Sequence, residues 1–167
     1  VLLARGERAL ARTAYGAFRK LFATLLDVPL ALDDDTSRKE AEARFRQTHA
    51  ELADQTSLLR DVLSFASADD SDDAEVDGLV RAENVRRLLL MILEQASSSG
   101  ALFVVDDAHA LDGLSWKLLV SIATQLPGVM TLITMRPMSD PPRELAAITA
   151  SERSRKLHLE PFDLEGV

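Results

Sequence analysis

Two adjacent carboxylates, Asp106 and Asp107, are the residues of this chain best suited to chemistry. The apolar run Leu102–Val105 before them is typical of a strand buried on both faces, as in a parallel sheet with helices on each side. Side chains directly after such a strand lie at the edge of the sheet where open α/β folds bind ligands. Because a charge without a partner is costly to bury, we expect a cation or a reacting group beside them.

This pattern predicts phosphoryl transfer, in which one acid holds Mg²⁺ and a second residue positions the attacking water. Successive residues of a strand point in different directions, so we assign Asp106 to the metal and Asp107 to the water. The opposite assignment stays open, and so does a purely structural role as helix-capping acids. Arg136 closes the next predicted buried strand, Val129–Met135, where its charge would stabilise a phosphate. An ordinary surface arginine is the alternative there.

His109 and Asp112 follow the acids within one turn. His109 has a structural role, or it hydrogen-bonds the acids, or it relays the state of a nucleotide. Asp112 is the predicted N-cap of a helix over Leu114–Leu126. The residues expected on the inward face of that helix are Trp116, Leu119, Val120, Ala123 and Leu126.

Two other kinds of site are rejected on spacing. A serine hydrolase built on His109, Ser115 and Asp106 fails because the segment 113–117 lacks the second glycine of a nucleophile elbow. A calcium loop starting at Asp73 fails because its twelfth position is Asn84 rather than Glu.

The rest of the chain reads as helices and strands around this βα turn. Spacing and capping signals predict the following elements: a strand over Val1–Ala4, an amphipathic helix over about 13–27, a polar helix from Asp33–Thr36 through Gln55 with Phe45 and Leu52 apolar, a short helix over 58–65, an acidic loop Ala66–Gly78, a long helix Asp77–Ala96, a short helix from Pro141–Pro142 to Ala150, and a strand over Leu157–Leu159. Strand, helix and strand over 101–135 form a βαβ unit.

Composition narrows the function classes. The 167 residues carry a net charge of −8, which argues against a nucleic-acid-binding surface, since such surfaces are usually basic. The absence of cysteine excludes disulfides, thiolate metal sites and cysteine nucleophiles, and it fits a reducing, cytoplasmic location. The apolar run Leu88–Leu93 is far shorter than the roughly 20 residues of a membrane span, so we expect no membrane contact.

The segment Val105–Asp112, followed by Leu118 and Leu119, resembles the Walker B region of STAND-type AAA+ ATPase modules. Such modules occur in soluble class III adenylate/guanylate cyclases and in large ATP-binding LuxR-type regulators. Thr134–Pro137 resembles their T-x-R-P strand end, which carries the sensor-1-like arginine. The segments 13–18 and 157–162 are similar to the stretches after the second strand and at the close of the nucleotide-binding core. Ala110 and Gly113 depart from the family pattern, which usually has Trp and Pro at these places.

The resemblance implies a three-layer P-loop NTPase-like α/β fold, with a parallel sheet flanked by helices, that is incomplete at the N-terminus. Residues 1–167 would be part of one ATPase domain, with a helical insert at about 28–78 and a Walker B to sensor-1 region at about 101–137. Asp106 would bind Mg²⁺, while His109 and Asp112 would contact the ATP side of the site. Asp107 and Arg136 would be catalytic. The output domain attached to such a module would be a cyclase, or else a DNA-binding or kinase domain.

One family feature is missing, because the sequence contains no G-x-x-x-x-G-K-[ST] loop to cradle phosphates. We therefore expect that the chain starts downstream of a Walker A segment and is inactive without it. The second hypothesis is a non-catalytic interaction domain on a degenerate P-loop scaffold. A receiver-type phosphoacceptor domain is a distant third, because the lysine and the topology that it needs are not evident.

Overall fold

The computed structural model describes residues 1–30, 34–63 and 75–160. In this part of the chain, three strands form one parallel sheet in the order β1 (Leu2–Arg5), β2 (Ala101–Asp106) and β3 (Val129–Ile133). The small parallel sheet is flanked by helices, so the predicted α/β class is confirmed. Val105, which precedes the acids, pairs with Ala4 on one side and with Ile133 on the other.

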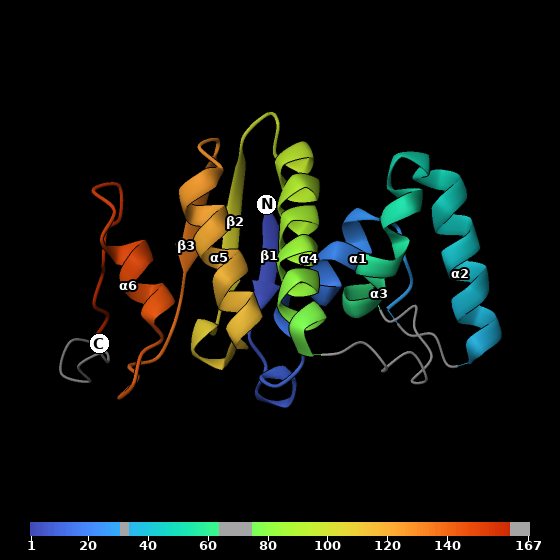
Figure 1. The fold of residues 1–167 in the computed structure, drawn as a ribbon. Helices are drawn as coiled ribbons and strands as arrows, with labels where there is room; N and C mark the ends of the chain where they lie inside the picture. The colour runs from blue at the N-terminus through green and yellow to red at the C-terminus, as the bar shows by residue number, and fades with distance from the viewer. Residues whose placement is uncertain (31–33, 64–74, 161–167) are drawn as a thin grey trace, which may run out of the picture.

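Helices cover one face of the sheet and extend beyond the edge formed by β1 (Figure 1). The α-helices of the described residues are α1 (Arg19–Leu25), α2 (Asp35–Thr48), α3 (Thr56–Leu63), α4 (Glu75–Ala96), α5 (Gly113–Gln125) and α6 (Arg143–Thr149). Short 3-10 helices are η1 (Arg8–Leu10), η2 (Gly16–Phe18), η3 (Ala50–Gln55) and η4 (Ala108–Ala110). Helix α5 packs against α4, α6 and β3, and α3 packs against both α4 and α1. One apolar core therefore holds these elements together.

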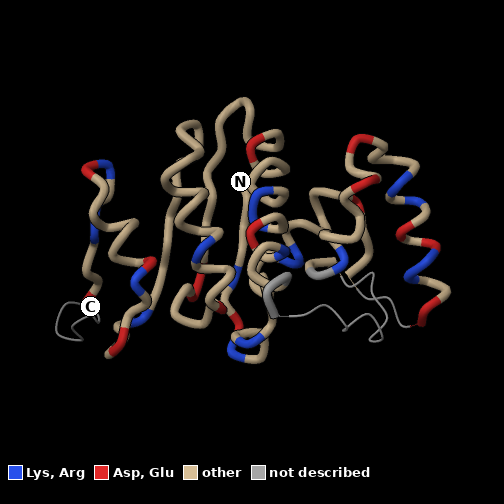
Figure 2. Tube along the Cα trace, in the orientation of Figure 1, with Lys and Arg blue, Asp and Glu red and all other residues tan. Residues whose placement is uncertain are grey.

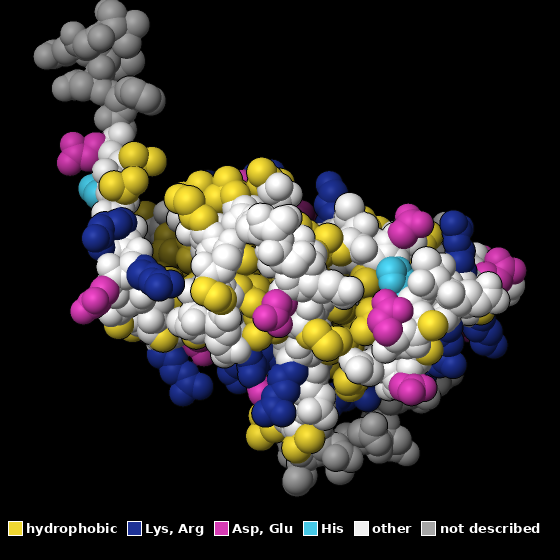
Figure 3. All heavy atoms as spheres, turned by 90° about the horizontal axis from the view of Figure 1, so that it is seen from above, with side chains coloured by type: hydrophobic (Ala, Val, Ile, Leu, Met, Phe, Trp, Pro, Cys, Tyr) yellow, Lys and Arg dark blue, Asp and Glu magenta, His cyan; other side chains and the backbone are white. Residues whose placement is uncertain are grey.

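The two faces of the sheet differ in burial. Phe103 and Val105 lie on the face covered by helices, and the Phe103 ring stacks on Phe18 of η2 with centroids 6.0 Å apart. On the opposite face Leu3, Met130 and Leu132 expose 58%, 70% and 46% of their surface. In Figure 3 hydrophobic side chains are spread over the side of the molecule that is seen from above, with one group of them at the upper left.

The prediction that 129–135 forms a buried strand is therefore wrong in two respects. Strand β3 ends at Ile133, and its residues alternate between half-buried and exposed. The physical reason is that β3 lies at the edge of the sheet, where only one of its faces meets helix α5 within the described residues.

Several element boundaries also differ from the predictions. Helix α1 begins at Arg19 rather than near residue 13, because Tyr15 adopts a left-handed conformation with φ 55° that an α-helix does not allow. The polar helix stops at Thr48, because His49 leaves the helical region, and Gln55 belongs to η3. Asp34 caps the polar helix by accepting a hydrogen bond from the Ser37 backbone N–H, as predicted.

Three further differences concern the long helix, the inward face of α5 and the last segment. Helix α4 already starts at Glu75, so the predicted acidic loop is helical over 75–78, and its other residues up to 74 lie outside the described residues. Ala123, predicted to face inward, is exposed, and Ile122 beside it is buried instead. Leu157–Leu159 forms no strand, and both leucines are almost fully exposed, because no described strand lies beside this segment to pair with it.

Candidate functional site

The strands bring charged residues together at the end of the sheet where their carboxyl ends meet, which we call the strand edge. Arg5, the last residue of β1, lies opposite Asp106, the last residue of β2. The Gly6 backbone N–H extends this pairing by donating to the Asp106 carbonyl oxygen at 2.8 Å. Acidic and basic residues meet at this end of the sheet, toward which the strands run (Figures 1 and 2). This is the edge at which parallel α/β sheets bind ligands.

The two adjacent carboxylates share Arg5 as a partner. Asp107 adopts a left-handed conformation with φ 54° and ψ 42°, which Asp tolerates better than most residues. The chain therefore turns sharply between β2 and η4. Arg5 spans both acids, with its Nε 3.5 Å from Asp106 Oδ2 and its Nη2 3.4 Å from Asp107 Oδ2. All three side chains are partly exposed, so the pairing is readily broken.

Thr134 fixes the orientation of Asp106 from the neighbouring strand end. Its hydroxyl donates to Asp106 Oδ1 at 2.6 Å and accepts from the Asp107 backbone N–H at 3.2 Å. Its carbonyl oxygen accepts from the Ala108 backbone N–H at 2.9 Å. The resemblance placed Thr134 at a strand end but gave it no role in the site. A signal was present, since a threonine directly follows the second strand of the βαβ unit.

A cavity of about 580 Å³ opens beside the acids. Its lining includes three predicted site residues, Asp107, His109 and Arg136, together with Arg5 and Arg8. His109 Nδ1 lies 3.9 Å from Asp107 Oδ1, and this buried nitrogen has no hydrogen-bond partner in the described residues. Asp106 does not line the cavity itself but lies next to it through Arg5.

Asp112 lies apart from this cavity and has a structural role. It is buried, and it caps α5 by accepting from the Leu114 and Ser115 backbone N–H groups at 3.0 Å. It also accepts from the Ser115 hydroxyl and, at 3.3 Å, from the Tyr15 backbone N–H. The predicted N-cap is thus confirmed, and the structure does not bring Asp112 together with the other site residues.

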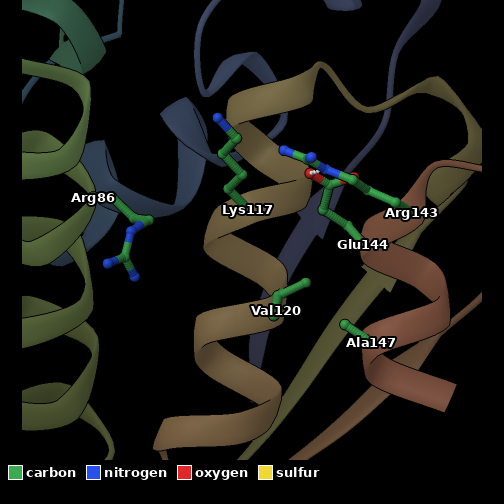
Figure 4. A pocket seen from close by; sticks show the side chains of 6 residues that line it. All are labelled: Arg86, Lys117, Val120, Arg143, Glu144 and Ala147. Carbon is green, nitrogen blue, oxygen red and sulfur yellow. Dashed lines mark hydrogen bonds and ion pairs between the residues drawn. The ribbon is translucent and has the colours of Figure 1, made fainter. Parts of the chain in front are cut away.

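A second cavity, of about 360 Å³, lies among α4, α5 and α6, where no site was predicted. Figure 4 shows Lys117 and Val120 of α5 facing Glu144 and Ala147 of α6, with Arg86 of α4 at one side. Arg86 and Arg143 pair with acids near them in sequence, and Arg86 also donates to the Ser121 hydroxyl of α5. The hydrogen bond from Arg86 lowers the pKa of Glu83 to about 2, and the same bond raises the pKa of Arg86.

The donor set at the strand edge fits a hard cation. Asp106, Asp107 and Thr134 offer carboxylate and hydroxyl oxygens, which are the ligands that Mg²⁺ prefers. No group of three or more His, Asp or Glu side chains in the described residues is placed to hold a metal ion. A magnesium ion here would therefore need waters or phosphate oxygens as further ligands, which is how Mg²⁺ usually binds in nucleotide sites.

Comparison with known proteins finds no family model that matches the chain, and no curated protein or solved structure that is significantly similar to it. None of the helices in residues 1–30, 34–63 and 75–160 has both the length and the apolar character that a membrane crossing requires.

Proposed function

We propose that this chain binds a magnesium-bound nucleoside triphosphate at the strand edge, as part of an ATP-binding and ATP-hydrolysing regulatory module. The observation that carries the proposal is the cavity beside the acids, which combines Asp107, His109 and Arg136 from two strand ends. A carboxylate that can hold a metal, a second that can face water and a cation for phosphate are the groups that phosphoryl transfer uses.

Each residue has a role that its contacts allow. Asp106, held by Thr134, is the ligand for Mg²⁺, which would supply charge stabilisation to the phosphate when bound. Asp107 faces the cavity and accepts a hydrogen bond from the attacking water. His109 Nδ1 lies 3.9 Å from Asp107 Oδ1, beyond hydrogen-bond distance, and would orient this carboxylate once the two side chains approach. Arg136 supplies positive charge where phosphate oxygens become more negative.

The proposal includes the finer fold and the context that the family resemblance implies. In the three-layer P-loop fold, helices cover both faces of the sheet and a glycine-rich loop grips the phosphates. Such a loop is not part of these 167 residues, so the phosphate grip would come from a further segment. The module would then control an attached cyclase, with a DNA-binding or kinase domain as the other output candidates, in the cytoplasm.

The experiment measures the binding of Mn²⁺, a spectroscopic substitute for Mg²⁺, to the chain with and without ATP. Asp106→Asn should weaken Mn²⁺ binding by about tenfold or more, because one charged ligand is lost. Asp107→Asn should weaken it less and should lower turnover in a protein that has the phosphate loop. Asp54→Asn, which removes an exposed acid of η3, is the matched control. Equal Mn²⁺ affinity in Asp106→Asn and the unsubstituted chain would contradict the proposal.

A second candidate function is a non-catalytic protein-interaction domain on the same scaffold. The exposed apolar row of Leu3, Met130 and Leu132 on the open face of the sheet favours it, since such patches often mark contact surfaces. Unchanged metal binding and turnover in Asp106→Asn, with loss of a partner in Leu132→Asp, would support this second function instead.

A further inference from the structure

One cation already occupies the position between the two acids. Arg5 contacts one oxygen of each carboxylate, Oδ2 of Asp106 and Oδ2 of Asp107. The other oxygens face elsewhere, since Asp106 Oδ1 accepts from Thr134 and Asp107 Oδ1 lies 3.9 Å from His109 Nδ1. The guanidinium therefore covers Oδ2 of Asp106, the oxygen that the Thr134 contact leaves for Mg²⁺, together with Oδ2 of Asp107.

Arg5 and a divalent cation cannot share this position. Positive charges a few ångströms apart repel, and the guanidinium occupies the oxygens that a metal would use. Arg5 is free to leave, because 63% of its side chain is exposed and its pairing with the acids is long. It also lines the cavity in which phosphate would lie under the proposed function. A guanidinium matches phosphate oxygens in charge and in the geometry of its N–H groups.

We infer that Arg5 is an exchangeable counter-ion: it neutralises Asp106 and Asp107 while the site is empty of metal, and it moves to the nucleotide phosphate when Mg²⁺ binds. This inference rests on the proposed function. It makes Arg5 a positioning residue that lowers the affinity for the metal alone and raises the affinity for the metal–nucleotide complex. Metal binding without nucleotide is thereby disfavoured.

The test is a Mn²⁺ titration of the chain, followed by electron paramagnetic resonance, with and without ATP. Arg5→Gln should bind Mn²⁺ alone on the order of tenfold more tightly, because a positive charge next to the ligands is gone. The same variant should bind Mn²⁺–ATP more weakly. Arg5→Lys keeps the charge but not the two-pronged geometry, and it should return the affinity for Mn²⁺ alone close to that of the unsubstituted chain.

Arg8→Gln is the matched control. Arg8 lines the same cavity, but in the described residues its side chain pairs with neither acid, so Mn²⁺ affinity should change by less than about threefold. Thermal unfolding of each variant shows whether it is folded, and Arg5→Met, which also removes the charge but keeps an unbranched side chain, replaces Arg5→Gln if that variant does not fold.

The outcomes separate this inference from the proposed function. If Asp106→Asn loses Mn²⁺ binding while Arg5→Gln binds Mn²⁺ no more tightly than the unsubstituted chain, the exchange is wrong and the proposed function stands. If Asp106→Asn keeps Mn²⁺ binding intact, the proposed function itself fails. Opposite changes for Mn²⁺ and for Mn²⁺–ATP in Arg5→Gln support the exchange, since a residue that only stabilises the fold would shift both in one direction.

Discussion

The cavity beside the acids and the cavity among α4, α5 and α6 contain similar charged groups but assemble them in different ways. At the strand edge, Arg5 and Asp107 pair although they lie 102 positions apart in the chain. In the cavity among α4, α5 and α6, two arginines form ion pairs with acids close to them in sequence, Arg86 with Glu83 and Arg143 with Glu144. The first arrangement depends on the completed sheet, whereas the ion pairs of the second each lie within one helix, and α4 is joined to α5 there by the hydrogen bond from Arg86 to the Ser121 hydroxyl.

This difference shows that the charged groups at the strand edge are held in place by the tertiary fold. A local pair forms wherever a helix places two charges one turn apart, and it contributes little at an exposed position. A pair between distant segments requires strand pairing and a fixed turn. Forming these features costs chain entropy, which the contacts of the strand edge must offset. Perturbing the contacts that hold the strand edge should therefore have large effects, and perturbing a helical pair should have small ones.

The largest effect is expected at Asp112, which holds the segment after β2 to a distant part of the chain. Its carboxylate accepts from Leu114 and Ser115 in α5 and from Tyr15, 97 positions away. Asp112→Ala removes an N-cap and leaves buried donors unsatisfied, so we expect about 2–4 kcal/mol of lost stability. Urea unfolding followed by circular dichroism measures the change.

Asp112→Asn is the control for this variant. Asn is as good an N-cap as Asp, so most of the stability should return. A loss below about 0.5 kcal/mol in Asp112→Ala would mean that the cap is a local feature like the helical ion pairs, and the contrast between the two regions would weaken.

The second effect is expected at Gly6, where β1 passes close to the acid turn. A Cβ added to Gly6 would lie 2.2 Å from the Asp107 carbonyl oxygen and 3.1 Å from its carbonyl carbon. Because these are backbone atoms, Gly6→Ala must displace the strand end or the turn, at about 1–3 kcal/mol. The displaced turn should also weaken Mn²⁺ binding in the titration described above.

Gly113→Ala is the matched control, because a Cβ at Gly113 in the first turn of α5 meets no atom within 4 Å. Alanine there should leave stability unchanged or raise it slightly, by up to about 1 kcal/mol. Equal stability of Gly6→Ala and Gly113→Ala would show that the strand edge tolerates movement.

Local signals in the sequence were enough to predict much of this architecture. The apolar run before Asp106 predicted β2, and the capping residues Asp34 and Asp112 predicted the starts of α2 and α5. The grouping of Asp107 with Arg136 followed from parallel strands ending at one edge, and one cavity contains both. The catalytic and metal-binding roles of these residues stay predictions.

Other features could not be predicted because they depend on partners far away in the chain. Arg5 is unremarkable by sequence, and only the register of β1 on β2 places it between the acids. The exposed face of β3 could not be predicted for a similar reason. An apolar run has the same sequence pattern whether one face of the strand or both faces are covered. Tyr15 interrupted a regular helical pattern through a left-handed backbone that the Asp112 contact helps to hold.

The smallest effect is expected at Glu83, the local pair beside the helical cavity. Its carboxylate accepts from Arg86 at 2.6 Å and from Arg87 at 2.8 Å, and the bond from Arg86 lowers its pKa from 4.5 to about 2. A lowered pKa in the folded state means that the carboxylate stabilises the fold above about pH 4.5, and that this contribution disappears as the pH falls through about 2.

Glu83→Gln should thus lower the free energy of unfolding at pH 7 by less than about 1 kcal/mol, because the pair is partly exposed to water and salt. The difference from the unsubstituted chain should shrink toward zero between pH 4.5 and 2, measured by urea unfolding at each pH. Glu94→Gln removes a carboxylate of the same helix that has no ion pair in the described residues, and it should not reproduce the loss at pH 7. A loss of unfolding free energy in Glu83→Gln as large as that in Asp112→Ala would contradict the distinction between locally and distantly assembled charges. A pair within one helical turn would then stabilise the fold as much as a contact between distant segments.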